Sequence, residues 1–283
     1  MRNDFAVFIT THGRADSQLT LNTLLANGYK GAWYLVVDDT DTQIEAYIHN
    51  HGADRVIVFN KAHFMTVTES CLVVPHPKAV VFARNAVEYI AQQLGYKYFM
   101  VVDDDIFKLR YRYIENSSLR SANLGESLDS IFDLIVEYMD SANIACMTFG
   151  FTNAYRGGVS AFRKFGQRNR FCAELFIRRV NIPVSWRANF VEDLVTSIDA
   201  GIRGEVFLQF IPIQLELYMS EGEISGGMSD AYLQTGRYKF YSLPVVIYPN
   251  CISVELTDNK WRTRTNARYS VPQIISSRYK KAN

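Results

Sequence analysis

The sequence predicts an α/β protein, with a mostly parallel sheet in its first hundred residues joined to a smaller, mixed second half. Three observations support this prediction. The chain has 283 residues and is 48% hydrophobic, which is enough material for one well-packed core. Short apolar runs alternate with amphipathic stretches along the first half. Two of the apolar runs end in clusters of carboxylates, which is typical of the ligand-binding edge of such a sheet.

The elements of the first half follow from hydrophobic periodicity and capping residues. Runs such as FAVFIT and AWYLVVDD are short and apolar, which favours strands. The stretch DSQLTLNTLLANG has helical spacing, with Asp16 or Ser17 as the expected cap and Gly28 at its end. The predicted order is strand 5–10, helix 16–28, strand 32–39, helix 41–50, strand 54–59, a loop to about residue 80, helix 84–94 and strand 98–102.

The second half is less regular. A Gly-rich stretch at 220–230 is expected to be a loop, either a plain surface turn or a segment whose amides contact phosphate. The other predicted elements are helix 126–140, strand 144–151, strand 171–178, helix 191–200, strand 206–211 and strand 243–248. We expect one domain over residues 1–258, made of the halves 1–105 and 106–258, and a basic tail over 259–283.

The composition argues against several classes of protein. The first apolar run, Phe5 to Ile9, is too short for a signal sequence or a membrane span, so we expect a soluble, cytoplasmic protein without a membrane partner. The four cysteines lie far apart, without a CxxC pair or a nearby histidine, which disfavours a disulfide framework or a zinc site. The loop THGRADS lacks the GxGxxG pattern, which disfavours dinucleotide binding.

The most informative motif is the triplet Asp103, Asp104 and Asp105, which directly follows the apolar run YFMVV. On an extended backbone Asp103 and Asp105 project to one face and Asp104 to the other. Two convergent carboxylates repel each other unless a cation lies between them, and Mg²⁺ or Mn²⁺ prefers oxygen ligands and accepts substrate phosphates. An acidic surface turn is the alternative, but nothing offsets its repulsion. We predict that Asp103 and Asp105 bind Mn²⁺ or Mg²⁺ together with a diphosphate.

Other polar residues at strand ends and helix starts are candidates for nucleotide contacts. Asp38 and Asp39 end the second strand, where carboxylates commonly accept hydrogen bonds from ribose hydroxyls. Capping of the next helix by Asp39 or Asp41 is an equally good explanation. Arg14 precedes one helix, where its guanidinium can meet a phosphate together with the helix dipole. Arg84 opens another helix and can reach a nucleotide or phosphate, with a solvated arginine at a helix start as the equally good alternative.

The stretch NFVEDLVTSI places Glu192 and Asp193 in the first turn of a helix. The helix dipole alone favours acids there, so a purely structural role is one explanation. If this helix faces the metal site, one of the two is well placed as the general base that removes a proton from an acceptor hydroxyl. Both residues are therefore catalytic candidates.

Charge is unevenly distributed, although the net charge is only +1. Residues 156–187 hold eight cations and a single acid, Glu174, and residues 260–283 hold seven cations and no acid. Two basic segments on an otherwise acidic chain suggest an anionic partner, with solvated surfaces as the alternative. The candidate contacts are Arg163, Lys164, Arg168, Arg170, Lys260, Arg262 and Arg264.

With the acidic triplet at a strand end and the late Glu-Asp pair, the chain resembles GT-A fold glycosyltransferases. More narrowly, the segments ITTHGRADS, WYLVVDDTD, FARNAVEYIAQQLGYKYFMVVDDDI and FVEDLVTSI, in that order, resemble the TET/JBP-associated glycosyltransferases of bacteriophages, relatives of the base J glucosyltransferase. The resemblance implies a GT-A-like fold with a Rossmann-like nucleotide-sugar-binding half and an acceptor half. It also implies sugar transfer from a UDP-linked sugar to the hydroxyl of a modified pyrimidine in DNA.

The same resemblance assigns roles by position. Asp103 and Asp105 would bind the metal and the diphosphate, and Asp193 matches the base of inverting members, beside Glu192. The His that completes the metal site near the C-terminus of many GT-A enzymes has no counterpart here. The implied nucleotide-sugar-binding residues are Arg14, Asp38 or Asp39, Arg84, Asp103 and Asp104.

A DNA acceptor, double-stranded or locally opened, accounts for the two basic segments. Lysine and arginine neutralise phosphates, and the interleaved aromatic residues can stack on bases. A saccharide or protein acceptor on the same fold is the alternative. A DNA-binding or nucleotide-binding module without activity is a third possibility, which the carboxylates at 103, 105, 192 and 193 disfavour.

Overall fold

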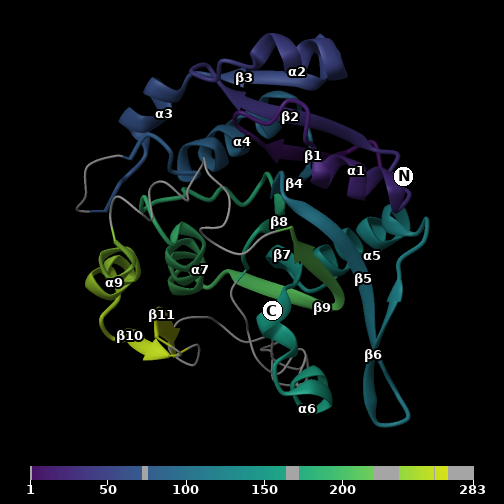
Figure 1. The fold of residues 1–283 in the computed structure, drawn as a ribbon, viewed down its shortest axis with the longest axis vertical. Coiled ribbons are helices and arrows are strands. Elements are labelled where there is room, and N and C mark those ends of the chain that lie inside the picture. The colour runs from purple at the N-terminus through teal and green to yellow at the C-terminus, as the bar shows by residue number, and fades with distance from the viewer. Residues whose placement is uncertain (1, 72–75, 164–171, 219–235, 258, 267–283) are drawn as a thin grey trace, which may run out of the picture.

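The structure, a computed structural model, describes residues 2–71, 76–163, 172–218, 236–257 and 259–266 (Figure 1). Its strands are β1 (Phe5–Thr10), β2 (Ala32–Asp38), β3 (Val56–Phe59), β4 (Tyr98–Asp103), β5 (Ile106–Glu115), β6 (Ser118–Asn123), β7 (Ile144–Gly150), β8 (Leu175–Arg179), β9 (Val206–Leu217), β10 (Ile252–Thr257) and β11 (Lys260–Thr265). Its helices are α1 (Leu19–Ala26), α2 (Ile44–His51), η1 (Ala53–Arg55), α3 (Lys61–Val67), α4 (Val81–Gln93), α5 (Leu128–Ser141), η2 (Thr152–Tyr155), α6 (Gly158–Arg163), α7 (Glu192–Ile202) and α9 (Arg237–Ile247).

Nine of these strands form one mixed sheet in the order β3-β2-β1-β4-β8-β7-β9-β5-β6. The strands β3, β2, β1 and β4 are all parallel, which confirms the parallel sheet expected for the first half. Thr10 pairs with both Val36 and Asp103, so β1, β2 and β4 end at the same edge. The carboxylates that follow β2 and β4 are therefore brought to one edge of the sheet.

The second half continues the same sheet instead of building a separate one. β8 is antiparallel to β4 and to β7, β7 is parallel to β9, and β5 and β6 complete the edge as an antiparallel hairpin. Val102 of β4 pairs with Leu175 of β8. Because of this register, Glu174, which precedes β8, lies beside the end of β4.

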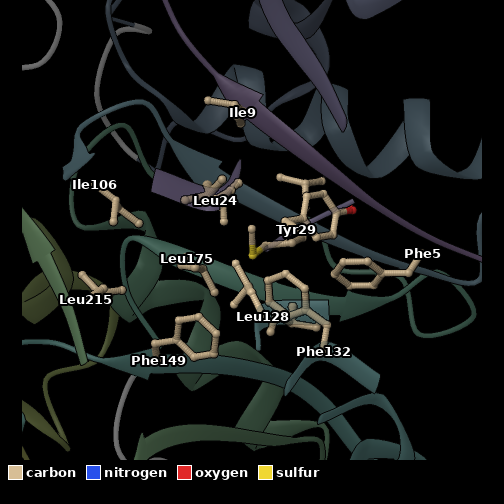
Figure 2. Packing of buried hydrophobic residues seen from close by; sticks show 14 of the residues in the cluster. Phe5, Ile9, Leu24, Tyr29, Ile106, Leu128, Phe132, Phe149, Leu175 and Leu215 are labelled. Atoms are coloured by element: carbon tan, nitrogen blue, oxygen red, sulfur yellow. The ribbon is translucent and has the colours of Figure 1, made fainter. Parts of the chain in front are cut away.

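Buried apolar side chains cover both faces of the sheet. The larger cluster lies under α1 and α5, and Figure 2 shows how its rings and aliphatic side chains interlock between the helices and the sheet. Phe132 of α5 stacks on Phe149 of β7, with ring centroids 6.1 Å apart, and also contacts Phe5 of β1. The second cluster lies on the opposite face, where Phe82 of α4 packs near Trp186. A sheet covered on both faces holds its carboxyl edge rigidly.

Some predicted elements were wrong. Residues 243–247 form the end of α9 and Tyr248 follows it, in place of a strand, because Phe240 and Leu243 bury the same helix face against Phe190. A short apolar run does not distinguish a strand from a buried helix. The expected loop before residue 80 contains α3, which is capped by the Asn60 side chain accepting from the amide of His63.

Two further differences concern the loop after β1 and the hairpin β5–β6. The predicted cap at Asp16 or Ser17 was wrong, since α1 begins after Gln18 without a side-chain cap. The loop before α1 is held instead by α2 and by the segment just before α2. The amides of residues 13, 14 and 15 donate to Asp41, Tyr47 and Gln43, respectively. The hairpin was not predicted because its strands carry many charged residues in place of a regular apolar alternation.

The predicted basic tail begins with a strand. Residues 260 to 265 form β11, which pairs with β10 as a small antiparallel hairpin. The remainder of the predicted tail and the Gly-rich stretch at 220–230 lie outside the described residues. Within the described ranges, every helix falls short of the length and apolar character that a bilayer crossing needs.

Candidate active site

The acidic triplet forms a turn and not an extended strand end. Asp103 is the last residue of β4, and Asp104 and Asp105 form the turn into β5. Thr20 of α1 holds this turn, because its hydroxyl donates to the Asp103 carbonyl at 2.6 Å and accepts from the Ile106 amide at 2.9 Å. The predicted alternation of side chains on an extended backbone was therefore wrong. The turn gives each carboxylate different surroundings.

Asp104 is buried, with 6% of its surface exposed, and is neutralised by Arg14. Its carboxylate accepts from the Thr11 hydroxyl at 2.6 Å and from the Arg14 guanidinium. Burial raises the pKa of Asp104, while Arg14 and Thr11 oppose that rise. Two residues predicted to contact the nucleotide sugar are thus in contact with each other.

Arg84 joins the end of β4 to the start of α7. Its guanidinium lies 3.4 Å from the Asp103 carboxylate and forms an ion pair with Glu192. Only 3% of Arg84 is exposed, and the guanidinium lies over the rings of Phe176 and Trp186 at 4.8 and 5.3 Å. Arg84 is therefore a buried structural cation of the site and not a solvated residue at a helix start.

Asp105 has the electrostatic surroundings of a cation ligand. Burial and the negative charges of Asp103 and Asp104 raise its pKa to about 7. One of its carboxylate oxygens is buried and has no hydrogen-bond partner among the described residues. Within the same residues, His, Cys, Asp and Glu side chains nowhere gather in threes as a metal site. A divalent cation held by Asp103 and Asp105 fits this pattern, because most of its coordination positions would remain for phosphate oxygens.

The first turn of α7 faces this acidic edge. Val191, just before the helix, has the left-handed φ of 56°, and Glu192 follows as a buried residue paired with Arg84. Burial raises the pKa of Glu192 to about 7 although Arg84 opposes the rise. Among the residues that the structure describes, the side chain of Asp193 accepts only from the amide of Leu194, at 2.7 Å. Burial raises the pKa of Asp193 as well, with Asp103 adding to the effect. The structure thus brings the two acidic motifs together.

Glu174 is an acid of this site that we did not predict. Its φ is +65°, and the Leu175 amide donates to the Ala173 carbonyl at 2.7 Å, which makes a γ-turn of the rarer, strained form. Burial and the charges of Asp103, Asp105 and Asp193 raise the pKa of Glu174 well above its usual range. The one available signal was that Glu174 is the single acid in the basic stretch 156–187.

The end of β2 forms a second polar cluster. The carboxylate of Asp38 is hydrogen-bonded to His12 at 2.7 Å and lies 3.2 Å from the Lys61 ammonium. Burial opposes the ionisation of Asp38, but the hydrogen bonds from His12 and Thr40 and the charge of Lys61 outweigh it and hold the pKa well below its usual range. Asp39 is exposed and accepts from the Lys61 amide at the start of α3. Asp39 is thus the more accessible of the two predicted nucleoside contacts.

The basic stretch 156–187 is not one surface. Arg178 is fully buried in β8 and paired with Glu88 at 3.1 Å, and Arg187 is paired with Asp199 at 2.6 Å. Arg178 belongs to the protein interior because β8 is a central strand, and Arg187 is occupied by its ion pair. Of the predicted contacts in this stretch, Arg163 is exposed at the end of α6. The others, Lys164, Arg168 and Arg170, lie outside the described residues.

The predicted contacts of the C-terminal segment begin in β11. Arg264 is exposed and paired with Glu255 of β10 at 3.0 Å, and Arg262 is partly exposed. Lys260 is the first residue of the same strand. Trp261 packs against Tyr238 of α9, with ring centroids 4.8 Å apart. Trp261, which lies between Lys260 and Arg262 in the chain, therefore packs the hairpin against α9.

Comparisons with known proteins identify the family of the chain and proteins of similar fold. The sequence profile of the TET-associated glycosyltransferase family matches residues 5–217, which include the whole acidic edge. No curated protein sequence matches the chain. A mannosyltransferase from Pyrobaculum calidifontis, solved with GDP-mannose and Mn²⁺, aligns with a TM-score of 0.51 and 9% identity over 87% of this chain and 65% of that one. Glucosyl-3-phosphoglycerate synthase from Mycobacterium tuberculosis, solved with Mn²⁺, UDP and phosphoglyceric acid, gives a TM-score of 0.49 and 10% identity over 94% and 87%.

Proposed function

The chain belongs to the TET-associated glycosyltransferase family, and from this premise we propose that it is a metal-dependent enzyme that transfers a sugar from a UDP-linked sugar to the hydroxyl of a modified pyrimidine in DNA. The observation that carries the proposal is the meeting of the β4–β5 turn with the first turn of α7. This meeting supports the proposal because the negative charges of Asp103 and Asp105, the proposed cation ligands, act on the same acidic edge as Asp193, the proposed base.

Asp103 and Asp105 are the residues that would hold Mn²⁺ or Mg²⁺ in this chain. The cation would offset the negative charge that develops on the leaving diphosphate. The buried oxygen of Asp105, which has no hydrogen-bond partner in the described part of the chain, supports this assignment. The Mn²⁺ and GDP-mannose in the P. calidifontis mannosyltransferase support the choice of a divalent cation and a nucleoside diphosphate sugar. Uridine as the nucleoside follows from the resemblance to DNA glucosyltransferases.

Asp193 is better suited than Glu192 to act as the base. Glu192 is ion-paired with Arg84, whereas within the described part of the chain the side chain of Asp193 accepts only from a backbone amide. In the proposed step the acceptor oxygen bonds to the anomeric carbon while the bond from that carbon to the diphosphate breaks. The hydroxyl proton moves to the Asp193 carboxylate, and the nucleoside diphosphate leaves with the bonding electrons. The raised pKa of Asp193 makes it a stronger base near neutral pH.

The other residues of the edge position these groups. Arg84 holds Asp103 and Glu192 in place, and Arg14 balances the charge of Asp104. Asp39 is the proposed nucleoside contact, because Asp38 is already bonded to His12 and Thr40 and lies against Lys61. Each of these residues positions another group and does not itself react.

The test is direct. We would incubate the protein with Mn²⁺ or Mg²⁺, a panel of nucleotide sugars and DNA containing hydroxymethyl pyrimidines, and then weigh the digested nucleosides by mass spectrometry. We expect a nucleoside heavier by one sugar, no product on unmodified DNA, and no product from Asp193→Asn. Full activity of Asp103→Ala or Asp105→Ala would reject the metal role. Transfer to a saccharide or protein but not to DNA would replace the proposed acceptor with the alternative one.

A further inference from the structure

The strand β5 carries a row of basic side chains on one face of the sheet. Lys108, Arg110 and Arg112 alternate with Leu109, which is buried in the main core cluster, and Tyr111, which packs against that cluster. Because successive side chains of a strand point to opposite faces, the three cations lie on the face opposite to the main core. This face is also the one on which α7 lies, since Ala200 of α7 and Phe207 of β9 share the second core cluster.

The short helices after β7 extend the same basic face. The guanidinium of Arg112 lies 4.8 Å from the ring centre of Tyr155 in η2. Tyr155 also belongs to a small apolar cluster against which Leu119 of β6 and Phe162 of α6 pack. Exposed Arg156 and Arg163 therefore lie beside the hairpin, next to which Figure 1 shows α6. We define the basic face as Lys108, Arg110, Arg112, Arg156 and Arg163.

Most cations of the basic face lack a carboxylate partner within the part of the chain that the structure describes, whereas Arg178 of β8 and Arg187 before α7 are ion-paired. Among the described residues, Lys108, Arg156 and Arg163 have no carboxylate within ion-pair distance, and Arg110 alone is paired, with Glu216 at 3.2 Å. In contrast, Arg178 and Arg187 are paired with Glu88 and Asp199. Positive charge without a protein partner attracts an external anion, and a row of such charges fits a polyanion better than a single small anion.

Two exposed rings lie where the basic face reaches the acidic edge. Phe107, which is 42% exposed, follows Asp105 by two residues. Ile106 and Leu109 both belong to the main core cluster, because the pairing of β5 with β9 shifts register between Ile106 and Lys108, so Phe107 points away from the main core as Lys108 does. Its ring packs edge-on against Tyr218, which is 59% exposed, at 6.2 Å between centroids. The Tyr218 amide also donates to the Asp105 carbonyl at 3.0 Å. Exposed aromatic rings beside a positively charged track are the usual platform for an unstacked nucleic-acid base.

We propose that the acceptor DNA binds along the basic face, with its phosphates on Lys108, Arg112, Arg156 and Arg163, and that the ring pair Phe107–Tyr218 stacks on the acceptor base at the entrance to the active site. This inference rests on the proposed function and adds the route by which the DNA reaches the site. It also moves the main DNA contacts away from β11, whose Arg264 is paired with Glu255.

The test compares two triple variants that lose the same charge. The basic-face variant is Lys108→Gln, Arg156→Gln and Arg163→Gln. The control variant is Lys30→Gln, Lys97→Gln and Arg120→Gln, all exposed residues. Arg120 pairs with Tyr113 across the hairpin, so it lies on the opposite face from Arg112. Binding is measured by fluorescence anisotropy with a labelled DNA single strand containing hydroxymethylcytosine, at several salt concentrations, and hydrolysis of the donor sugar without DNA is measured in parallel.

We expect the basic-face variant to bind DNA more weakly and its log–log salt dependence to become shallower by about 2, the value for three lost phosphate contacts on a single strand. The control variant should keep the wild-type slope, and donor hydrolysis should be unchanged in both. Phe107→Ala should reduce DNA transfer about tenfold or more at an unchanged salt slope, because base stacking carries no charge. Thermal melting of each variant checks that it is folded.

Two results would overturn the inference. If both triple variants lost the same DNA affinity, or if the basic-face variant kept the wild-type affinity, DNA would not bind to this face. The proposed reaction would still stand in either case. If the wild-type protein hydrolyses donor sugars but binds no DNA, the proposed acceptor and this inference both fail. If it neither binds nor hydrolyses any nucleotide sugar, the proposed function itself fails.

Discussion

Arg84 of α4 forms a buried ion pair with Glu192, the first residue of α7, although the two lie 108 positions apart in the chain. The same guanidinium lies 3.4 Å from Asp103 at the end of β4. One cation therefore joins the strand that carries the acidic triplet to the helix that carries the proposed base. The geometry of the active site depends on this link.

Replacing Arg84 should damage both stability and activity. Arg84→Gln leaves two carboxylates without their buried cation, and breaking a buried pair costs about 3–5 kcal/mol. We expect a loss of this order in the free energy of unfolding near neutral pH, measured with urea, together with loss of sugar transfer. Arg203→Gln removes an exposed cation paired with Glu205 and should cost at most about 1 kcal/mol. Similar costs for both variants would contradict the role given to Arg84.

Stability should fall as pH rises because of Glu192. Burial raises its pKa to about 7 in the folded protein, above its ordinary value of 4.5. The folded state therefore prefers the protonated form, so this contribution to stability is complete below about pH 4.5 and is lost as pH rises through about 7. Relative to Glu192→Gln, which does not ionise, the wild-type protein should lose free energy of unfolding across that range. Urea titrations of both proteins at several pH values measure this, and parallel pH curves would contradict the assignment.

Glu174 should show a trade-off between stability and activity. Glu174→Gln removes a carboxyl group whose ionisation is opposed on folding by burial and by the charges of Asp103, Asp105 and Asp193, so we expect a more stable protein that transfers sugar more slowly. Glu174→Gly should add about 1 kcal/mol of stability to that of the Gln variant, because glycine adopts the φ of +65° without strain. Urea unfolding and transfer assays measure the two effects. An exposed control, Glu115→Gln, should change neither, and a destabilised Glu174→Gln would show that the carboxylate is structurally required.

Cation binding should depend on Asp105. The wild-type protein should melt at a higher temperature when Mn²⁺ and UDP are added together, since a ligand that binds only the folded state stabilises it. Asp105→Asn should lose this increase. Without ligands the variant should melt higher than the wild type, because Asp103 and Asp104 no longer face a third carboxylate. Asp54→Asn, at an exposed carboxylate, serves as the matched control. An unchanged response to Mn²⁺ and UDP in Asp105→Asn would place the cation elsewhere.

Local sequence patterns were sufficient to predict the parallel half of the sheet. β1, β2 and β4 are apolar runs whose burial follows from their composition. The acidic triplet that begins at the last residue of β4 is also visible in the local sequence. Helix α7 and its two leading acids were also predictable from spacing and the preference for acids at a helix start. These are local properties, which depend on residues close together in the chain.

The partners of each charge depended on the tertiary structure. Arg14 and Arg84 look alike in the sequence as arginines near helix starts, but one neutralises Asp104 and the other links Asp103 to Glu192. Glu174 entered the site because β8 pairs antiparallel with β4. The parallel strands and the acidic residue types at their ends follow from local sequence. The pairing of each acid, the surroundings of the Asp105 oxygens and the exposure of each cation follow from the folded chain, because they depend on contacts between segments far apart in the sequence.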